Sequence, residues 1–215
     1  MAETLDSKQY VVDRLLATKR EGMEDLIADM EDLGFFEAPA SGGNHLASKY
    51  GLVYHTRHVM EMAEKIGVCL LGGEEYNKLH DSVMIVAGLH DLGKAGAFGK
   101  PFYVPNMIQD GRPTKKDPEQ KYKQSEKKPW ERNKELAAIG HAERSVVMAM
   151  REIELTEDEW FAIRYHDGLY ERANSELIGH ETPLMMILHW ADMWASRILE
   201  TKTGSTEERG NESWQ

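Results

Sequence analysis

The residues with the clearest chemical potential are His90 and Asp91, which follow an apolar run directly. On a helix, Val83, Ala87 and His90 share one face, so the imidazole and the carboxylate are expected to emerge together at a core-facing helix end. A buried carboxylate beside a buried imidazole is costly unless a third group pairs with both, and a divalent cation does so. The simpler interpretation is a histidine satisfied by the core and an aspartate that caps the next turn.

Other histidines and one aspartate also fall on apolar helical faces. His55 precedes an apolar stripe, His141 opens a helix, His166 closes another, and Asp192 interrupts the stripe of the last long helix. Each one alone is better explained as a hydrogen-bonded core residue. Together with the central pair they favour a metal site, because helical folds build such sites from side chains that converge from different helices. A set of His and Asp without Cys suits Mn, Fe, Co, Ni, Zn or Mg rather than a structural zinc.

Helices must position these side chains, and the apolar periodicity predicts them over most of the chain. Thr156, with acidic residues after it, forms a capping box, and Thr182 with Pro183 suits an N-cap and first helical position. Helical order is expected to resume near Glu135 or His141. The core stripes are predicted to contain Val146, Met150 and Ile153, then Leu184, Leu188, Ala191 and Ala195. The expected helices are residues 7–19, 23–33, 52–71, 76–92, 156–166 and 183–200. No segment alternates with period two, so the expected fold class is all-α.

Residues 95–135 differ in kind from the rest of the chain. They hold five of the seven prolines, and from Arg112 to Lys134 there are nine Lys or Arg against four Asp or Glu. We expect a long excursion with short helical pieces. It is either a solvated surface loop or a lid that brings positive charge to a phosphorylated ligand.

Composition limits the classes of function. The chain has 215 residues, 41% of them hydrophobic, and a formal net charge of −11, which suits one domain and argues against binding of long nucleic acid. A small anionic substrate remains compatible, because a bound metal inverts the local field. The one cysteine, Cys69, suits a reducing compartment. The chain shows no secretory signal and no membrane-spanning run, so a cytoplasmic protein is expected.

The motifs carry a resemblance to a known family. The order His55, His90-Asp91, Asp192 resembles the H…HD…D signature of HD-domain metal-dependent phosphohydrolases. The sequence around each of these positions is also similar to that family's, and further motifs resemble its bacterial and phage branch. The matching segments are GLVYHT at 51–56, AGLHDLGK at 87–94 and LHWAD at 188–192, then FEAPAS at 36–41, GHAERS at 140–145 and AIRYH at 162–166.

The resemblance covers about residues 35–199 and implies a single HD-domain helical bundle with a long basic insertion loop. The expected organisation is N-terminal helices at 1–34 packed on an HD domain at 35–201, with 95–135 as insertion or lid. Residues 202–215 are expected to form a flexible tail.

The resemblance also implies a ligand set. One divalent metal is expected on His55, His90, Asp91 and Asp192. Relatives with more histidines hold a second ion on residues placed like His141 and His166, with the carboxylate like Asp91 bridging. Some of them have consecutive histidines at the later position, where this chain has His166-Asp167, and an Asp can also ligate.

The expected reaction is attack of metal-bound water on a phosphate ester or anhydride. Asp91 and Lys94 are the candidate catalytic residues. Lys94 is placed to neutralise charge on phosphoryl oxygens, or else to complement a helix end. His45, Lys94 and Arg144 are the candidate substrate-binding residues.

The expected substrate is a small nucleotide. Relatives of this size include deoxynucleoside triphosphate triphosphohydrolases, 5′-nucleotidases and cyclic-nucleotide phosphodiesterases. The resemblance therefore implies a nucleoside or deoxynucleoside triphosphate, a nucleoside monophosphate or a cyclic nucleotide as substrate. The alternatives are a non-catalytic sensor that binds a metal and a nucleotide, and an HD-type di-iron oxygenase. No membrane partner is expected, an oligomer is left open, and the compartment is the bacterial cytoplasm, or that of the host if a phage encodes the protein.

Overall fold

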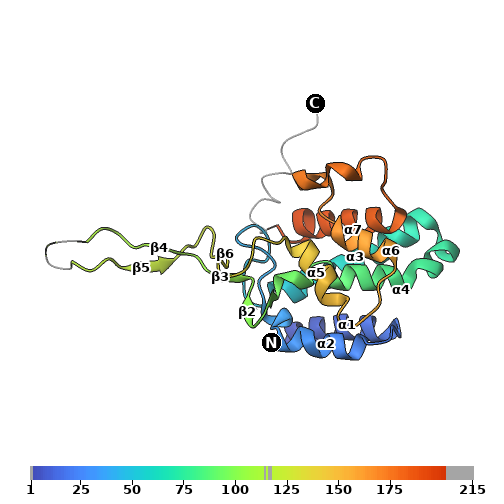
Figure 1. The fold of residues 1–215 in the computed structure, drawn as a ribbon, viewed down its shortest axis with the longest axis horizontal. Helices are drawn as coiled ribbons and strands as arrows, with labels where there is room; N and C mark the ends of the chain where they lie inside the picture. Colours follow the sequence, from blue (N-terminus) through green and yellow to red (C-terminus); the bar gives the residue numbers. More distant parts are fainter. Residues whose placement is uncertain (1, 114, 116–117, 202–215) are drawn as a thin grey trace.

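The computed structural model describes residues 2–113, 115 and 118–201, and most of them are helical (Figure 1). The expected tail at 202–215 lies outside the described residues. The longer helices are α1 Ala2–Ala17, α2 Met23–Asp32, α3 Gly51–Leu71, α4 Gly73–Leu89, α5 His141–Ala149, α6 Glu157–Arg164 and α7 Pro183–Trp194. The short turns are 3₁₀ helices η1 Phe35–Glu37, η2 Leu92–Lys94, η3 Gly168–Tyr170 and η4 Arg172–Leu177, and a π-helical turn η5 Ala195–Leu199.

Helices α3 and α4 form the centre of the bundle, with α1 and α2 on one side and α7 on the other (Figure 1). One continuous apolar core joins these layers. Leu15 of α1, Met60 of α3, Leu89 of α4 and Leu188 of α7 all belong to it and are fully buried. The helices that carry the candidate ligands all pack against this core.

Local signals in the sequence correctly predicted where α6 and α7 begin. The Thr156 hydroxyl accepts a hydrogen bond from the backbone N–H of Glu159, and the Glu159 carboxylate accepts one from the backbone of Thr156. Thr182 caps α7 with Pro183 in its first turn. The predicted capping box and N-cap are therefore confirmed. The predicted stripe of α7 is also buried: Leu184, Leu188, Ala191 and Ala195.

Other boundaries differ from the expected ones. Helix α1 begins at Ala2 rather than residue 7, and α4 spans Gly73–Leu89 rather than 76–92. Asp91 leaves the helical conformation, with φ −106° and ψ 12°. Of the predicted stripe Val146, Met150 and Ile153, the first and last are buried, but Met150 is wrong, because α5 ends at Ala149 and Met150 is 53% exposed.

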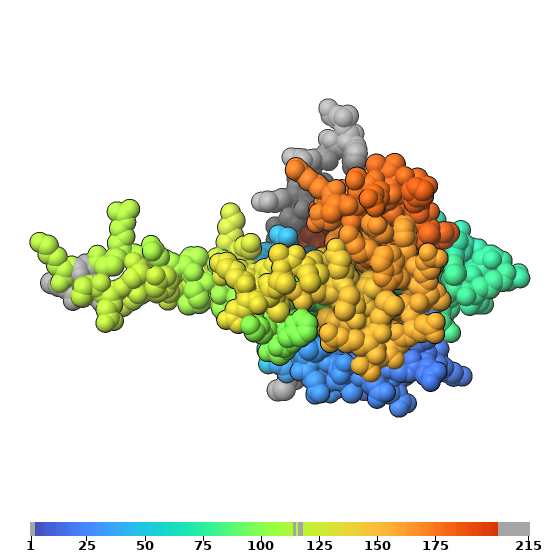
Figure 2. Space-filling model, in the orientation of Figure 1, coloured from blue at the N-terminus to red at the C-terminus, as the bar shows by residue number. Residues whose placement is uncertain are grey.

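The predicted short helical pieces in residues 95–135 are wrong, because this segment forms antiparallel two-stranded ladders. Strand β1 Gly96–Ala97 pairs with β2 Lys100–Pro101, β3 Tyr103–Pro105 with β6 Trp130–Arg132, and β4 Met107–Gln109 with β5 Tyr122–Gln124. The β4–β5 part projects from the bundle as a narrow arm (Figures 1 and 2). All residues of β4 and β5 are exposed. Because neither face of this ladder packs on a core, its sequence does not alternate between apolar and polar residues, and this alternation is the pattern that predicts a strand.

Within the described part of the chain, no helix combines the length and the apolar character needed to cross a lipid bilayer.

Candidate metal centre

Five helical elements bring the six predicted ligands together. His55 lies on α3, His90 and Asp91 follow the end of α4, and Asp192 lies on α7. His141 is the first residue of α5, and His166 follows the end of α6. These side chains form overlapping groups of nitrogen and oxygen atoms within 4.8 Å of one another, so they could hold a metal ion.

The first group has the spacing of metal ligands. His55 Nε2 lies 3.3 Å from His90 Nε2, 3.2 Å from Asp192 Oδ1 and 3.5 Å from Asp91 Oδ2. His90 Nε2 lies 3.4 Å from Asp91 Oδ2. Two ligands of one ion stand roughly 2.9–3.4 Å apart, because each bond is about 2.0–2.1 Å long and the angle between bonds is near 90–110°.

The outer nitrogens of three histidines fix which nitrogen faces the centre. His90 Nδ1 donates to the Ala87 carbonyl at 2.9 Å, and His166 Nδ1 donates to the Ile163 carbonyl at 2.8 Å. His55 Nδ1 donates to the Glu200 carboxylate at 3.0 Å. The other nitrogen of each ring, Nε2, therefore faces the centre and the other candidate ligands. Burial would lower the pKa of His55, but the Asp192 and Glu200 carboxylates raise it to about 10, so a cation bound at this ring would displace a proton. A proton on one nitrogen satisfies one or two of these ligands, whereas a cation satisfies all of them.

Asp91 faces a second group with its other oxygen. Oδ1 is buried and accepts no hydrogen bond from the residues that the structure describes. It lies 3.3 Å from His141 Nε2 and 3.7 Å from His166 Nε2, which are 3.2 Å apart. Asp167 Oδ2 lies 3.4 Å from His141 Nε2. The two oxygens of Asp91 thus join two groups of ligands, and the chemistry of both suits a divalent cation.

The electrostatic field of the centre favours positive charge. Burial alone would raise the pKa of Asp91, but Lys94 and His90 hold it well below its ordinary value. Burial alone would raise the pKa of Asp192, but its hydrogen bond with His55 and the nearby His55, His90 and His166 rings together lower it. Both carboxylates are therefore ionised at neutral pH. Burial lowers the pKa of His141 to about 4, which leaves its ring neutral and able to ligate.

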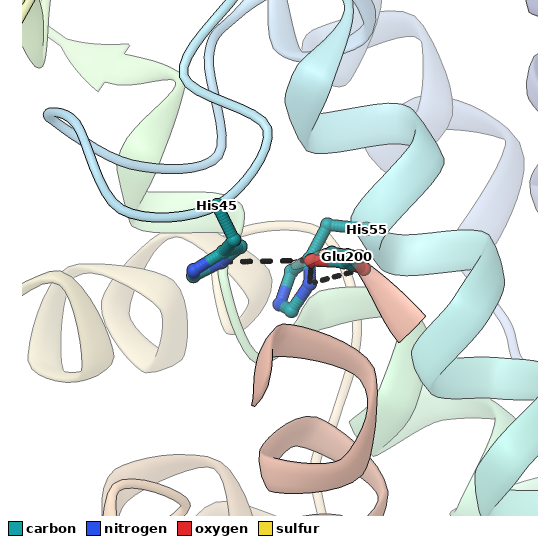
Figure 3. A group of neighbouring side chains, drawn as sticks. All are labelled: His45, His55 and Glu200. Carbon is teal, nitrogen blue, oxygen red and sulfur yellow. Dashed lines mark hydrogen bonds and ion pairs between the residues drawn. The ribbon is translucent and has the colours of Figure 1, made fainter. Parts of the chain in front are cut away.

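Glu200 belongs to the site, although no motif in the sequence indicated it. Its carboxylate accepts hydrogen bonds from His55 Nδ1 at 3.0 and 3.1 Å (Figure 3). It also accepts one from His58 Nδ1 at 2.9 Å. Burial alone would raise its pKa, but these histidines lower it to about 2. A π-helical turn sets its position, because the backbone N–H of Glu200 donates to the Ala195 carbonyl five residues back.

His45 approaches the same carboxylate from the loop between η1 and α3 (Figure 3). Its Nε2 lies 3.8 Å from Glu200 Oε2, is buried, and has no hydrogen-bond partner among the described residues. Burial lowers the pKa of His45 to about 4. The structure therefore places His45 beside the centre as a neutral ring.

A cavity of about 740 Å³ opens onto the centre. His45, Lys94, His166 and Asp192 are among the residues that line it. Lys94 donates to Asp91 Oδ2 at 2.6 Å, and although burial opposes its charge, Asp91 raises its pKa above the ordinary value. A lysine at this place is a permanent cation beside the candidate ligands.

The structure places Arg144 differently from the other candidate substrate-binding residues. Its side chain is buried, donates to the Ala137 carbonyl at 2.8 Å, and is not among the residues that line the cavity. A role in substrate binding stays a prediction for this residue.

Close packing of η2 on α5 aligns Asp91 with His141. A Cβ added at Gly93 would lie 2.2 Å from the His141 carbonyl oxygen, so only glycine permits this approach. The Ser145 hydroxyl accepts from the Gly93 N–H at 2.8 Å and donates to the His141 carbonyl at 2.9 Å. These bonds fix the distance between the two ligand-bearing segments.

No family model, curated protein or solved structure matches this chain.

Proposed function

We propose that this protein is an HD-type metal-dependent phosphohydrolase that acts on a small nucleotide. The observation that carries the proposal is the convergence of His55, His90, Asp91 and Asp192 beside an open cavity. A bound divalent cation would supply an activated water and neutralise charge on a phosphoryl oxygen. Mn, Co, Fe, Ni, Zn and Mg all accept ligands of this kind.

The residues of the chain have separate tasks in this proposal. The two carboxylates and the inward-facing Nε2 atoms hold the ion. Lys94 offers a charged donor to the phosphate oxygens, because its side chain reaches the cavity while its ammonium is fixed on Asp91. His45 also lines the cavity, so its ring is a further candidate contact for the phosphate. The second group, Asp91, His141 and His166, would hold a second ion.

The test is product analysis of a nucleotide panel incubated with protein loaded with Mn²⁺ or Co²⁺. The panel contains ribo- and deoxynucleotides as mono- to triphosphates and in cyclic form. Asp91→Asn removes the bridging charge, and Asp81→Asn is the matched control because Asp81 is exposed. We expect metal-dependent turnover in the wild type and the control, and none in Asp91→Asn. Full metal binding without turnover of any nucleotide would contradict the hydrolase and favour the sensor.

A di-iron oxygenase is the second candidate, because the two oxygens of Asp91 face two separate groups of ligands. Anaerobic assays separate the two activities. A hydrolase retains its turnover without oxygen, whereas an oxygenase loses it.

A further inference from the structure

A second cavity, of about 710 Å³, lies at the base of the arm. Its walls come from two segments that are distant in sequence, the loop at 42–44 and the strands β3 and β6 with the turn before β6. The Trp130 N–H donates to the Gly42 carbonyl, and the Trp130 indole donates to the Ala47 carbonyl, both at 3.1 Å. The walls are therefore bonded to each other, and the cavity is large enough for a nucleotide-sized ligand.

Positive charge lines this cavity. Lys127, Lys128 and Arg132 are among its lining residues, and neither lysine forms an ion pair with a residue that the structure describes. The turn that carries the lysines is fixed, because Lys128 N–H donates to Ser125 Oγ at 3.2 Å and Asn106 Nδ2 donates to the Lys128 carbonyl at 2.8 Å. Unpaired ammonium groups on a fixed turn are suited to a phosphate group.

The cavity adjoins the metal centre. His141, whose Nε2 lies 3.3 Å from Asp91 Oδ1, is one of its lining residues. Asn44 lines both this cavity and the one that contains Lys94. The second cavity therefore borders the centre at His141 and the first cavity at Asn44.

We propose that this second cavity is a phosphate subsite for a part of the substrate that does not react. The inference rests on the proposed function and narrows its substrate class to nucleotides with at least two phosphate groups. One phosphate would lie at the metal centre and the other against Lys127 and Lys128. The second phosphate belongs either to a polyphosphate chain or to a second nucleotide joined by a phosphodiester bond.

Three adenine ligands distinguish these sources: AMP, ATP and the 5′-phosphorylated dinucleotide pApA. Each is titrated calorimetrically into Mn²⁺-loaded protein, and the same samples are analysed for products. The test variant is Lys127→Ala/Lys128→Ala, whose exposed side chains can be removed without disturbing the core. The control is Lys123→Ala/Lys134→Ala, which removes equal charge from lysines that pair with Asp110 and Glu131 instead.

We expect ATP or pApA to bind the wild type more tightly than AMP, and the test variant to weaken that ligand by about ten- to a hundred-fold. AMP should bind the wild type and both double variants equally. If only ATP binds more tightly than AMP, the second phosphate belongs to a polyphosphate chain. If only pApA does, it belongs to a second nucleotide joined by a phosphodiester bond. Equal affinity for all three ligands, or equal losses in the test and control variants, would overturn the subsite. Tight, lysine-dependent binding with no product would instead overturn hydrolysis and leave the subsite intact.

Discussion

Replacing Glu200 by alanine should weaken metal binding, although this carboxylate points at the outer nitrogen of His55 and not at the centre. The bond between His55 Nδ1 and Glu200 is buried, charge-assisted and 3.0 Å long, and it holds the Nε2 lone pair toward the other ligands. Hydrogen bonds to charged groups contribute about 1.5–3 kcal/mol, which corresponds to roughly a 10- to 150-fold change in affinity. Partners that orient a metal-bound histidine have effects of about 10- to 100-fold.

Calorimetric titration of Mn²⁺ or Co²⁺ measures this effect. Glu200→Gln should lose less than Glu200→Ala, because the amide oxygen still accepts from His55. His58→Ala is the control, since it removes the other partner of Glu200 and leaves the bond to His55. Wild-type affinity in a folded Glu200→Ala protein would refute the reasoning.

Three further predictions concern stability. A chelator should lower the melting temperature of purified metal-loaded protein by roughly 5–10 °C, since a ligand at 100 times its Kd contributes about 2.7 kcal/mol; an unchanged melting curve counts against a bound ion. Gly93→Ala should cost about 1–3 kcal/mol in urea unfolding, because its Cβ overlaps the His141 carbonyl; a neutral substitution would mean that η2 and α5 are not in close contact. Glu159→Gln should cost about 2–3 kcal/mol at pH 7, below the ~3–5 kcal/mol of a fully buried pair because Arg20 is partly exposed. Burial alone would raise the pKa of Glu159, but the hydrogen bonds from Arg20, Thr156 and Ser82 together lower it. This stabilisation is therefore present above the ordinary value of 4.5 and is lost as pH falls through the lower folded pKa. The free energy of unfolding of the wild type should therefore approach that of Glu159→Gln as the pH is lowered from 7 to 3. A difference that stays constant over this range would contradict the assignment.

The sequence predicted the parts of the molecule that local patterns specify. The capping box at Thr156 and the N-cap at Thr182 need only neighbouring residues, and the stripe from Leu184 needs only helical periodicity. The convergence of His55 with the His90-Asp91 pair was expected from apolar faces and from the family resemblance, and the structure brings these residues within ligand distance.

The remaining features depend on interactions that no local pattern contains. Strands β4 and β5 are exposed on both faces, so their sequence lacks alternation. Glu200 reaches His55 because the chain changes from an α-helix to a π-helical turn after Trp194, which shifts the residues beyond it on the helix surface. Such a turn has no reliable sequence signal.

Metal content and ligand type test the central claim most directly. Protein loaded with Co²⁺ and dialysed should retain at least one equivalent per chain, with an X-ray absorption spectrum that shows imidazole nitrogen and carboxylate oxygen ligands. Asp91→Asn should fold and lose the ion, whereas the exposed control Asp81→Asn should retain it. A wild-type chain that retains no Co²⁺, Mn²⁺, Fe²⁺ or Zn²⁺ after dialysis would contradict the metal centre.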